Sequence, residues 1–166
     1  MTRHPGDTRR LIELADLQPG AKVLDLGAGD GDGVRLLRSL GYDAAGIDRI
    51  AAGDVEQGDL LHTTFATNRF DAVMSECAFF LTGDVPGALR ESARLLKPGG
   101  KLLLADIFFE DPEPLLEAAG FRLIHKEDWT KAWREYYLRS IWEGTAEVCP
   151  VPKGKSTYWM LIARKD

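Results

Sequence analysis

Apolar residues fall into short runs that alternate with helical patterns along most of the chain. Three runs are bounded by polar turns, as expected for buried strands: Lys22–Leu26, Ala44–Asp48 and Phe70–Ser75. A fourth, Lys101–Asp106, follows Lys97-Pro98-Gly99-Gly100, where we expect proline to end the preceding helix and the glycines to allow a tight turn. The pattern therefore predicts at least four buried strands in the first two thirds of the chain.

Apolar positions at helical spacing lie between these strands. They predict helices over Val34–Leu40 and Val85–Leu96, the second capped by Asp84. Asp7–Leu17, ahead of the first strand, predicts one amphipathic helix. Strands that alternate with helices indicate an α/β fold built on a parallel sheet.

The last third of the chain changes character. Phe121–Ile124 and Thr157–Ile162 are typical of strands, and we interpret the segment between them, at about 128–152, as a helical insertion in a single domain over 1–166. The predicted helix there is Trp129–Trp142. Its apolar residues recur at helical spacing at Trp129, Ala132, Trp133, Tyr136, Tyr137 and Ile141.

Charge and hydropathy exclude several classes of partner. The 166 residues carry a net charge of −5, whereas binding to nucleic acid needs a basic surplus or stripe. The apolar stretch at Val73–Leu81 is interrupted by Ser75 and Glu76 and is far shorter than the roughly 20 residues that cross a bilayer. The first residues lack the apolar core of a signal peptide. We therefore expect a cytoplasmic protein with no nucleic-acid or membrane partner, and leave its oligomeric state open.

Cysteines and histidines do not form a recognisable metal or disulfide pattern. Cys77 and Cys149 lack a CxxC spacing, which indicates reduced thiols rather than a disulfide framework or structural zinc site. His4, His62 and His125 show no ligand spacing. We expect no metal site.

The most informative segment is a glycine-rich turn that follows the first strand, within Val23–Gly33. It does not have the G-x-G-x-x-G spacing of a dinucleotide site, because the sixth position counted from Gly27 is Asp32. Asp30 and Asp32 also place negative charge where a pyrophosphate would approach the next helix. The turn therefore favours a ligand that lacks phosphate and carries an ammonium group.

Leu24-Asp25-Leu26-Gly27-Ala28-Gly29-Asp30-Gly31 resembles the first motif of class I S-adenosylmethionine-dependent methyltransferases. The resemblance implies a Rossmann-like sheet of order 3-2-1-4-5-7-6 with the seventh strand antiparallel. It also implies S-adenosylmethionine as cofactor, with S-adenosylhomocysteine as product. The resemblance extends to Gly46–Asp48, Gln57–Leu60, Arg69–Val73, Leu96–Leu102 and Ala118–Phe121.

The resemblance and the spacing together suggest a role for each residue near the cofactor. Asp48 ends a strand about 20 residues after the glycine turn, where a carboxylate accepts ribose hydroxyls. Asp59 and Leu60 fit the adenine ring, and Asp25 fits the methionine end together with Gly27–Gly29. For each aspartate alone a turn or cap residue is the favoured explanation, but the order of the aspartates together favours a site. The predicted cofactor-binding residues are Asp25, Gly27, Ala28, Gly29, Asp48, Arg49, Asp59, Leu60 and Ser75.

One departure from the family pattern lies between Asp48 and Gly58. The nine residues there leave no room for the usual helix, so we expect only a turn and a third strand that is short or displaced. The N-terminal extension is also minimal, so the cap over the substrate must be small or come from elsewhere in the chain.

Glu76 is the candidate catalytic residue, because it follows the fourth strand at the edge where ligands bind in open α/β folds. It would act as a general base or orient the ligands; a carboxylate that merely binds backbone is the competing interpretation. Cys77 is interpreted as an inert thiol rather than a nucleophile or soft-metal ligand. Arsenite methylation needs several cooperating cysteines and is only a weak alternative.

The aromatic stripe of the inserted helix has two interpretations. One is core packing, and the other is an aromatic wall for the acceptor, with Tyr137 and Arg134 as substrate-binding residues. We predict methyl transfer to a small-molecule acceptor. The alternatives are a non-catalytic or regulatory protein that binds an S-adenosyl ligand and, disfavoured by the glycine spacing, a nicotinamide oxidoreductase.

Overall fold

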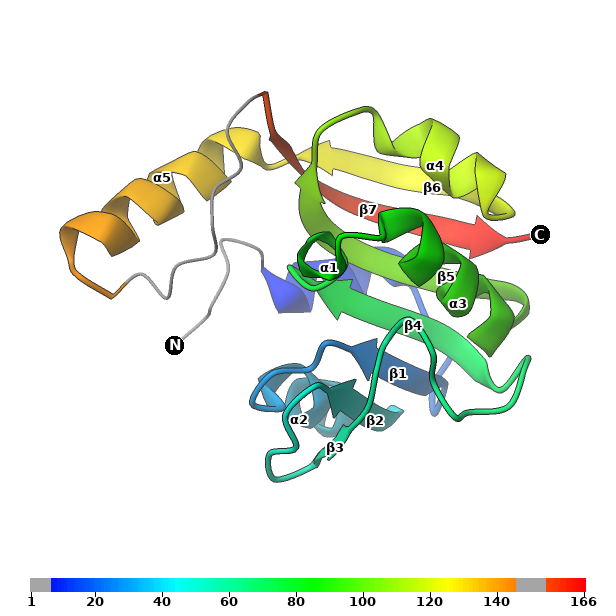
Figure 1. Cartoon of the computed structure of the whole chain (residues 1–166). Helices are drawn as coiled ribbons and strands as arrows, with labels where there is room; N and C mark the ends of the chain where they lie inside the picture. The colour runs from blue at the N-terminus through cyan, green and yellow to red at the C-terminus, as the bar shows by residue number, and fades with distance from the viewer. Residues whose placement is uncertain (1–6, 146–154) are drawn as a thin grey trace.

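One seven-stranded sheet organises the computed structural model, which describes residues 7–145 and 155–166 (Figure 1). Helices cover both faces of this sheet. The strands are β1 (Lys22–Leu26), β2 (Asp43–Asp48), β3 (Val55–Gln57), β4 (Phe70–Glu76), β5 (Leu96–Phe108), β6 (Phe121–Asp128) and β7 (Thr157–Lys165). The helices are α1 (Thr8–Ala15), α2 (Asp32–Ser39), the 3-10 helix η1 (Phe80–Thr82), α3 (Val85–Leu95), α4 (Pro112–Ala118) and α5 (Thr130–Trp142).

The strand order is β3-β2-β1-β4-β5-β7-β6. Neighbouring strands from β3 to β5 pair in parallel, and β7 runs antiparallel to both β5 and β6. The predicted order and the antiparallel seventh strand are therefore confirmed. This topology brings the carboxyl ends of β1 to β6 to one edge of the sheet, which we call the carboxyl edge.

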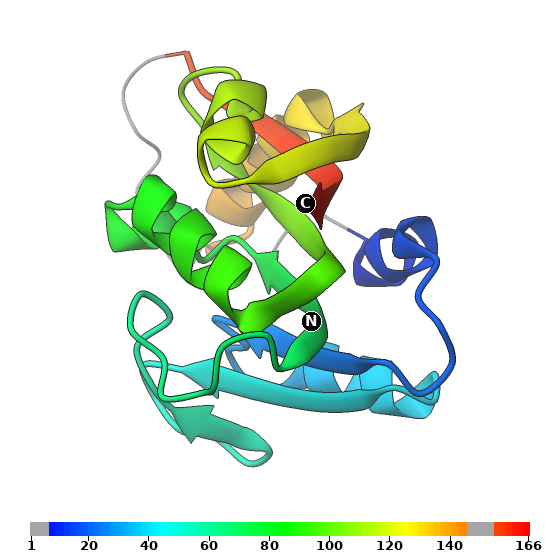
Figure 2. The same cartoon turned by 90° about the vertical axis from the view of Figure 1, so that its right-hand side faces the viewer.

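The core is divided between the two faces of the sheet. On one face, Leu11 of α1 and Leu37 of α2 are fully buried against the strands. On the other, Leu89 of α3 and Leu116 of α4 do the same, and Figure 2 shows α3 and α4 on the side opposite α1. Both faces are covered, which explains the nearly continuous apolar runs in the central strands.

The connection between β2 and β3 is short, as predicted. Residues 49–54 contain no helix, and Ala52 forms an antiparallel bridge with Val55, so a tight turn leads directly into the third strand. That strand is three residues long and pairs in parallel with Gly46–Asp48. The usual helix is missing from this edge of the sheet, and the strand is correspondingly short.

The prediction for the start of β5 was wrong. We expected Pro98 to end the preceding helix and a turn at Gly99 and Gly100, but α3 ends at Leu95 and Leu96 already pairs with Phe70. The register with β4 shifts between Phe70 and Ala72, so the strand accommodates the proline and glycines in an irregular stretch. α4, which the sequence analysis did not predict, follows the same strand.

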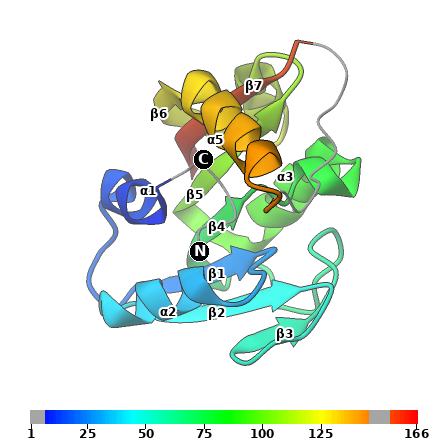
Figure 3. The same ribbon diagram turned by 90° about the vertical axis from the view of Figure 1, so that its left-hand side faces the viewer.

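The inserted helix is α5, close to its predicted bounds. Its first turns pack on the sheet, where Trp133 is 6% exposed and stacks on Tyr158 with 6.2 Å between ring centroids. Farther along, Leu138 and Trp142 are 65% and 92% exposed. Figures 1 and 3 show the helix projecting past the carboxyl edge. The predicted remainder of the insertion, 146–152, and Cys149 within it, lies outside the described residues.

Candidate functional site

The glycine turn leaves β1 at the carboxyl edge and leads into α2. Gly27, Gly29 and Gly31 all have positive φ values, of 78°, 57° and 88°. A Cβ atom on Gly27 would lie 2.3 Å from the Cβ of Ala78, so this position has no room for a side chain. The turn is thus held closely against the segment that follows β4.

Asp48, at the end of β2, binds the glycine turn directly. Its Oδ2 accepts a hydrogen bond from the Gly29 N–H at 2.9 Å, and its Oδ1 accepts one from the Ile50 N–H at 3.3 Å. The N–H groups of Gly27 and Ala28 donate to the carbonyl of Ile47 at 2.9 Å. The predicted neighbours Asp48, Gly27, Ala28 and Gly29 therefore meet at one place.

Asp25 lies beneath the turn and is 5% exposed. Burial raises the pKa of its carboxyl group well above the usual value, and the nearby charges of Glu76 and Asp48 raise it further. A Cβ on Gly33 would lie 2.7 Å from the Asp25 Oδ2, which explains the glycine at the start of α2. Three carboxyl groups from three strands thus converge at the carboxyl edge, an arrangement that favours a cationic ligand.

Glu76 ends β4 beside this group. Its Oε2 accepts a hydrogen bond from the Thr8 hydroxyl at 3.2 Å, which links α1 to the carboxyl edge. Cys77 follows with φ of 52°, and its Sγ lies 3.4 Å from the hydroxyl of the buried Tyr158. The chain therefore turns sharply just after the candidate catalytic residue.

Residues 24–104 match the family profile described as methyltransferase domain. The chain belongs to the class I S-adenosylmethionine-dependent methyltransferases. This family uses S-adenosylmethionine as methyl donor and releases S-adenosylhomocysteine.

Two curated relatives and one solved structure illustrate the similarity. Over 129 residues the chain is 39% identical to demethylmenaquinone methyltransferase of Corynebacterium urealyticum, covering 72% of this chain and 52% of that protein. Over 130 residues it is 31% identical to phosphoethanolamine N-methyltransferase of Triticum aestivum, covering 69% of this chain and 26% of that protein. The chain thus spans about a quarter to about a half of the length of these relatives.

The solved structure is phosphoethanolamine N-methyltransferase 2 of Haemonchus contortus in complex with phosphomonomethylethanolamine and S-adenosylhomocysteine. It matches with a TM-score of 0.76 at 18% identity, over 95% of this chain and 52% of that one. At this identity the match establishes the shared fold alone.

Of the four remaining predicted cofactor residues, Leu60 and Ser75 lie beside the same turn. Leu60 is half-buried, and its Cδ2 would lie 3.7 Å from a Cβ on Gly27. Asp59 is exposed and its Oδ1 accepts from the Leu61 N–H at 2.9 Å, while Arg49 is also exposed. Ser75 is fully buried and its hydroxyl donates to the Leu26 carbonyl at 2.7 Å. The hydroxyl of Ser75 therefore links β4 to β1. Contact of the cofactor with Leu60, Asp59, Arg49 and Ser75 stays a prediction.

The two predicted substrate residues lie on α5. Arg134 is exposed and donates from Nη2 to the Ser156 carbonyl at 3.2 Å, which ties the helix to the start of β7. Tyr137 is half-buried, one turn beyond the buried Trp133. Neither residue lies in the core, and their contact with an acceptor stays a prediction.

Two residues at the carboxyl edge, Asp106 and Glu127, were not among the predicted site residues. Asp106, inside β5, is 1% exposed and accepts backbone hydrogen bonds from Phe79 and Ile107 at 2.9 and 2.7 Å. Glu127, near the end of β6, accepts from the Arg10 Nε at 3.0 Å. The signal in the sequence for Asp106 was a single acid within the otherwise apolar stretch Leu102–Phe108 of β5.

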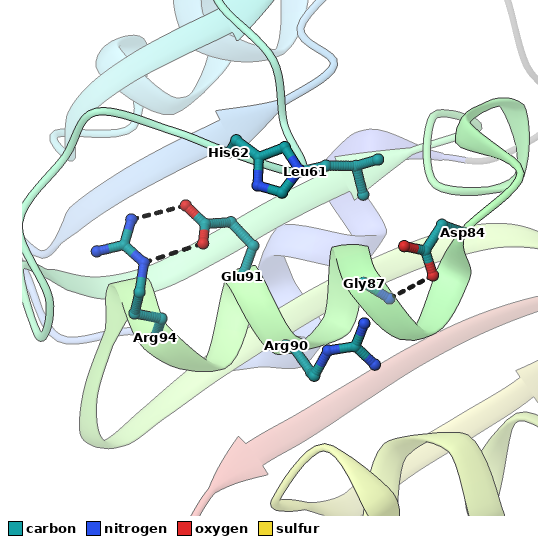
Figure 4. A pocket seen from close by; sticks show the side chains of 7 residues that line it. All are labelled: Leu61, His62, Asp84, Gly87, Arg90, Glu91 and Arg94. Atoms are coloured by element: carbon teal, nitrogen blue, oxygen red, sulfur yellow. Dashed lines mark hydrogen bonds and ion pairs between the residues drawn. The ribbon is translucent and has the colours of Figure 1, made fainter.

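Two surface cavities are lined by residues outside the glycine turn. One, of about 280 Å³, lies between α3 and the segment after β3 (Figure 4). Its polar groups have structural partners: Glu91 pairs with Arg94, and Asp84 caps α3 through the Gly87 N–H. The other, of about 450 Å³, lies at the opposite, amino edge, beside Lys97–Lys101. Neither displays the converging carboxyl groups of the glycine turn.

The described residues, 7–145 and 155–166, contain neither a metal-binding cluster nor a membrane-spanning helix. Within these ranges, histidine, cysteine and acidic side chains form no group of three or more that could hold a metal ion. Within them, too, no helix is long and apolar enough to cross a membrane. His4 and Cys149 lie outside the described residues.

Proposed function

We propose that this chain transfers a methyl group from S-adenosylmethionine to a small-molecule acceptor. The observation that carries the proposal is the hydrogen bond between Asp48 and the glycine turn, with the carboxyl groups of Asp25 and Glu76 close by at the carboxyl edge. The turn presents backbone at close range and the carboxylates supply negative charge, and both features suit a ligand with an ammonium and a sulfonium group.

S-adenosylmethionine supplies an activated methyl group on a positively charged sulfur. In this proposal Asp48 accepts the ribose hydroxyls, and Asp25 with the Gly27–Gly29 backbone binds the methionine end. Leu60 and Asp59 lie at the adenine side. Methyl transfer is an in-line displacement that depends mainly on positioning and exclusion of water. Glu76 orients the acceptor or takes its proton where the acceptor must lose one.

The acceptor is proposed to lie beyond Glu76, on the side of β4 and β5. Phe80 of η1 and Phe109 after β5 have ring centroids 5.8 Å apart, and Phe109 is 51% exposed. Leu81 is 56% exposed beside them, and Tyr137 and Arg134 on α5 are the remaining candidate contacts. These side chains support a small acceptor with an apolar part.

The test is a screen of metabolites for release of S-adenosylhomocysteine from S-adenosylmethionine. We expect at least one acceptor to be methylated, with the product identified by a mass gain of one methyl group. Release that is the same with every metabolite and with none would contradict the proposal. A Gly29→Val variant is the control, because its side chain would occupy the space through which the cofactor approaches.

The absence of a helix between β2 and β3 motivates an alternative function, which is ligand binding without catalysis. A protein that only binds the S-adenosyl ligand, or regulates a partner, would bind S-adenosylhomocysteine tightly but would not produce it from S-adenosylmethionine with any metabolite in the screen. Turnover with any acceptor would eliminate this alternative. Binding without turnover would favour it.

A further inference from the structure

Asp106 is the buried carboxyl group that the proposed chemistry does not use. It lies near the end of β5 and its side chain is 1% exposed. Its Oδ2 accepts hydrogen bonds from the N–H groups of Phe79 and Phe80 at 2.9 and 3.3 Å, and its Oδ1 accepts one from Ile107 at 2.7 Å. One side chain on β5 thus binds consecutive backbone amides of the segment that follows β4.

This segment separates the candidate catalytic residue from η1. It begins at Cys77, whose left-handed backbone turns the chain away from β4, and its Ala78 packs against Gly27 so closely that a Cβ there would lie 2.3 Å away. The N–H of Cys77 also donates to the Ala105 carbonyl at 2.9 Å. A continuous set of contacts therefore runs from Asp106 through Ala78 to the glycine turn.

We propose that Asp106 is a positioning residue for the cofactor site, because its carboxylate holds the turn after β4 against the glycine turn. The inference rests on the proposed location of the cofactor at that turn. Asp106 acts through backbone amides and does not contact the cofactor itself.

The electrostatic environment shows that this arrangement is costly to the fold. Burial raises the pKa of Asp106 to about 6, while the hydrogen bonds from Ile107, Phe80, Phe79 and Ala78 oppose that rise. If this position only had to fill space in the core, an apolar side chain would do so without the free-energy cost of burying a carboxyl group. The bound amides explain why an acid occupies this position.

The test measures the affinity for S-adenosylhomocysteine by calorimetry, in variants that circular dichroism shows to be folded. Asp106→Asn keeps the shape of the side chain, but its NH₂ group faces backbone N–H donors and cannot accept their hydrogen bonds. We therefore expect this variant to bind S-adenosylhomocysteine about tenfold more weakly than the parent. Asp106→Ala removes every acceptor and is expected to bind more weakly still, so that asparagine is a partial rescue. Folded Asp106→Asn that binds within about twofold of the parent would overturn the proposal.

The matched control is Asp71→Asn at the amino end of β4. Asp71 also accepts a backbone hydrogen bond, from Lys22 at 2.8 Å, and it pairs with Lys97, but it lies far from the glycine turn in the sheet. We expect its affinity for S-adenosylhomocysteine to stay within about twofold of the parent. An equal loss in both variants would overturn the proposal, since it would indicate a general effect of destabilisation.

Asp48→Ala separates this inference from the proposed cofactor location. If the Asp48→Ala variant and the Asp106 variants all bind S-adenosylhomocysteine as tightly as the parent, the proposed location of the cofactor is wrong. If the Asp106 variants bind as tightly as the parent but Asp48→Ala binds more weakly, the location is supported and the positioning role of Asp106 is wrong. Should both Asp106 variants fail to fold, hydrogen exchange on the parent decides. S-adenosylhomocysteine is expected to slow exchange at Phe79 and Phe80, and slower exchange at the glycine turn alone would overturn the proposal.

Discussion

Asp48 binds the backbone of the glycine turn through its side chain. One carboxylate oxygen holds the Gly29 amide at 2.9 Å and the other holds the Ile50 amide at 3.3 Å. A carboxylate has about four lone-pair sites, so both oxygens can also accept from ribose hydroxyls. The same residue therefore shapes the turn and offers the acceptor atoms that a ribose needs.

Asp48→Ala is expected to weaken binding of S-adenosylhomocysteine by about 1.5–3 kcal/mol, because charge-assisted hydrogen bonds are lost. Calorimetry measures the change directly. The matched control is Asp43→Ala, an exposed aspartate at the opposite end of the same strand, which should bind like the parent. Unchanged affinity of the Asp48 variant would remove this residue from the site.

Glu76→Gln separates a general base from a binding residue. The glutamine keeps an acceptor for the Thr8 hydroxyl but cannot take a proton. If Glu76 is the base, turnover should fall by ~10²–10⁴ while the affinity for S-adenosylhomocysteine is nearly unchanged. Steady-state kinetics and calorimetry on one preparation test this. A parallel loss of cofactor affinity would assign Glu76 to binding instead.

At the scale of elements, α5 has two different parts. Its amino-terminal part is anchored, because Trp133 is 6% exposed and stacks on Tyr158. Its carboxyl-terminal part exposes Leu138, Ile141 and Trp142. The aromatic stripe therefore contributes to the core at Trp133 but not along its whole length, and the prediction of core packing holds for part of the helix.

Trp133→Ala should cost ~3–5 kcal/mol of the free energy of unfolding, because it leaves a large cavity over the sheet. Trp142→Ala, in the same helix but 92% exposed, should change that free energy by at most about 0.5 kcal/mol. Urea denaturation followed by circular dichroism compares the two variants. Equal losses would mean that the far end of α5 packs more tightly than its exposure indicates.

At the scale of the whole molecule, Glu127 joins elements that are distant in sequence. It accepts hydrogen bonds from Arg10 of α1 and from the Trp129 indole, both at 3.0 Å, and lies 2.9 Å from the His125 Nε2. The hydrogen bond from Arg10, with smaller contributions from His125 and Trp129, lowers the pKa of Glu127 to about 2. α1, β6 and the start of α5 thus share one carboxylate.

This pKa predicts a dependence of stability on pH. Glu127 is ionised more readily in the folded chain than in the unfolded chain, so it stabilises the fold above pH 4.5, its ordinary pKa, and loses that effect as the pH falls towards 2. Glu127→Gln should therefore be less stable than the parent at neutral pH, and the difference should shrink on acidification. Urea midpoints over this range test it, with the exposed Glu113→Gln as control. A difference independent of pH would contradict the assignment.

Most elements were predictable because each depends on local sequence. The glycine turn, the Asp84 cap and the short connection after Asp48 follow from spacing and residue type within a few positions. The start of β5 was not predictable in this way. Proline and glycine usually interrupt a strand, but pairing of Leu96 with Phe70 and a shift of register accommodate them.

The sequence by itself determined the alternation of strands and helices, the strand order through its family motifs, and the residue types at the glycine turn. Only the tertiary structure decided that Asp106 binds the amides of Phe79 and Phe80 and that Glu127 binds Arg10, since these three partners lie 26 or more residues away in the chain. It also decided that the hydroxyl of Ser75 binds the Leu26 carbonyl inside the sheet. Hydrophobic periodicity records which face of an element is buried, whereas the partner of a buried polar group depends on which strands become neighbours.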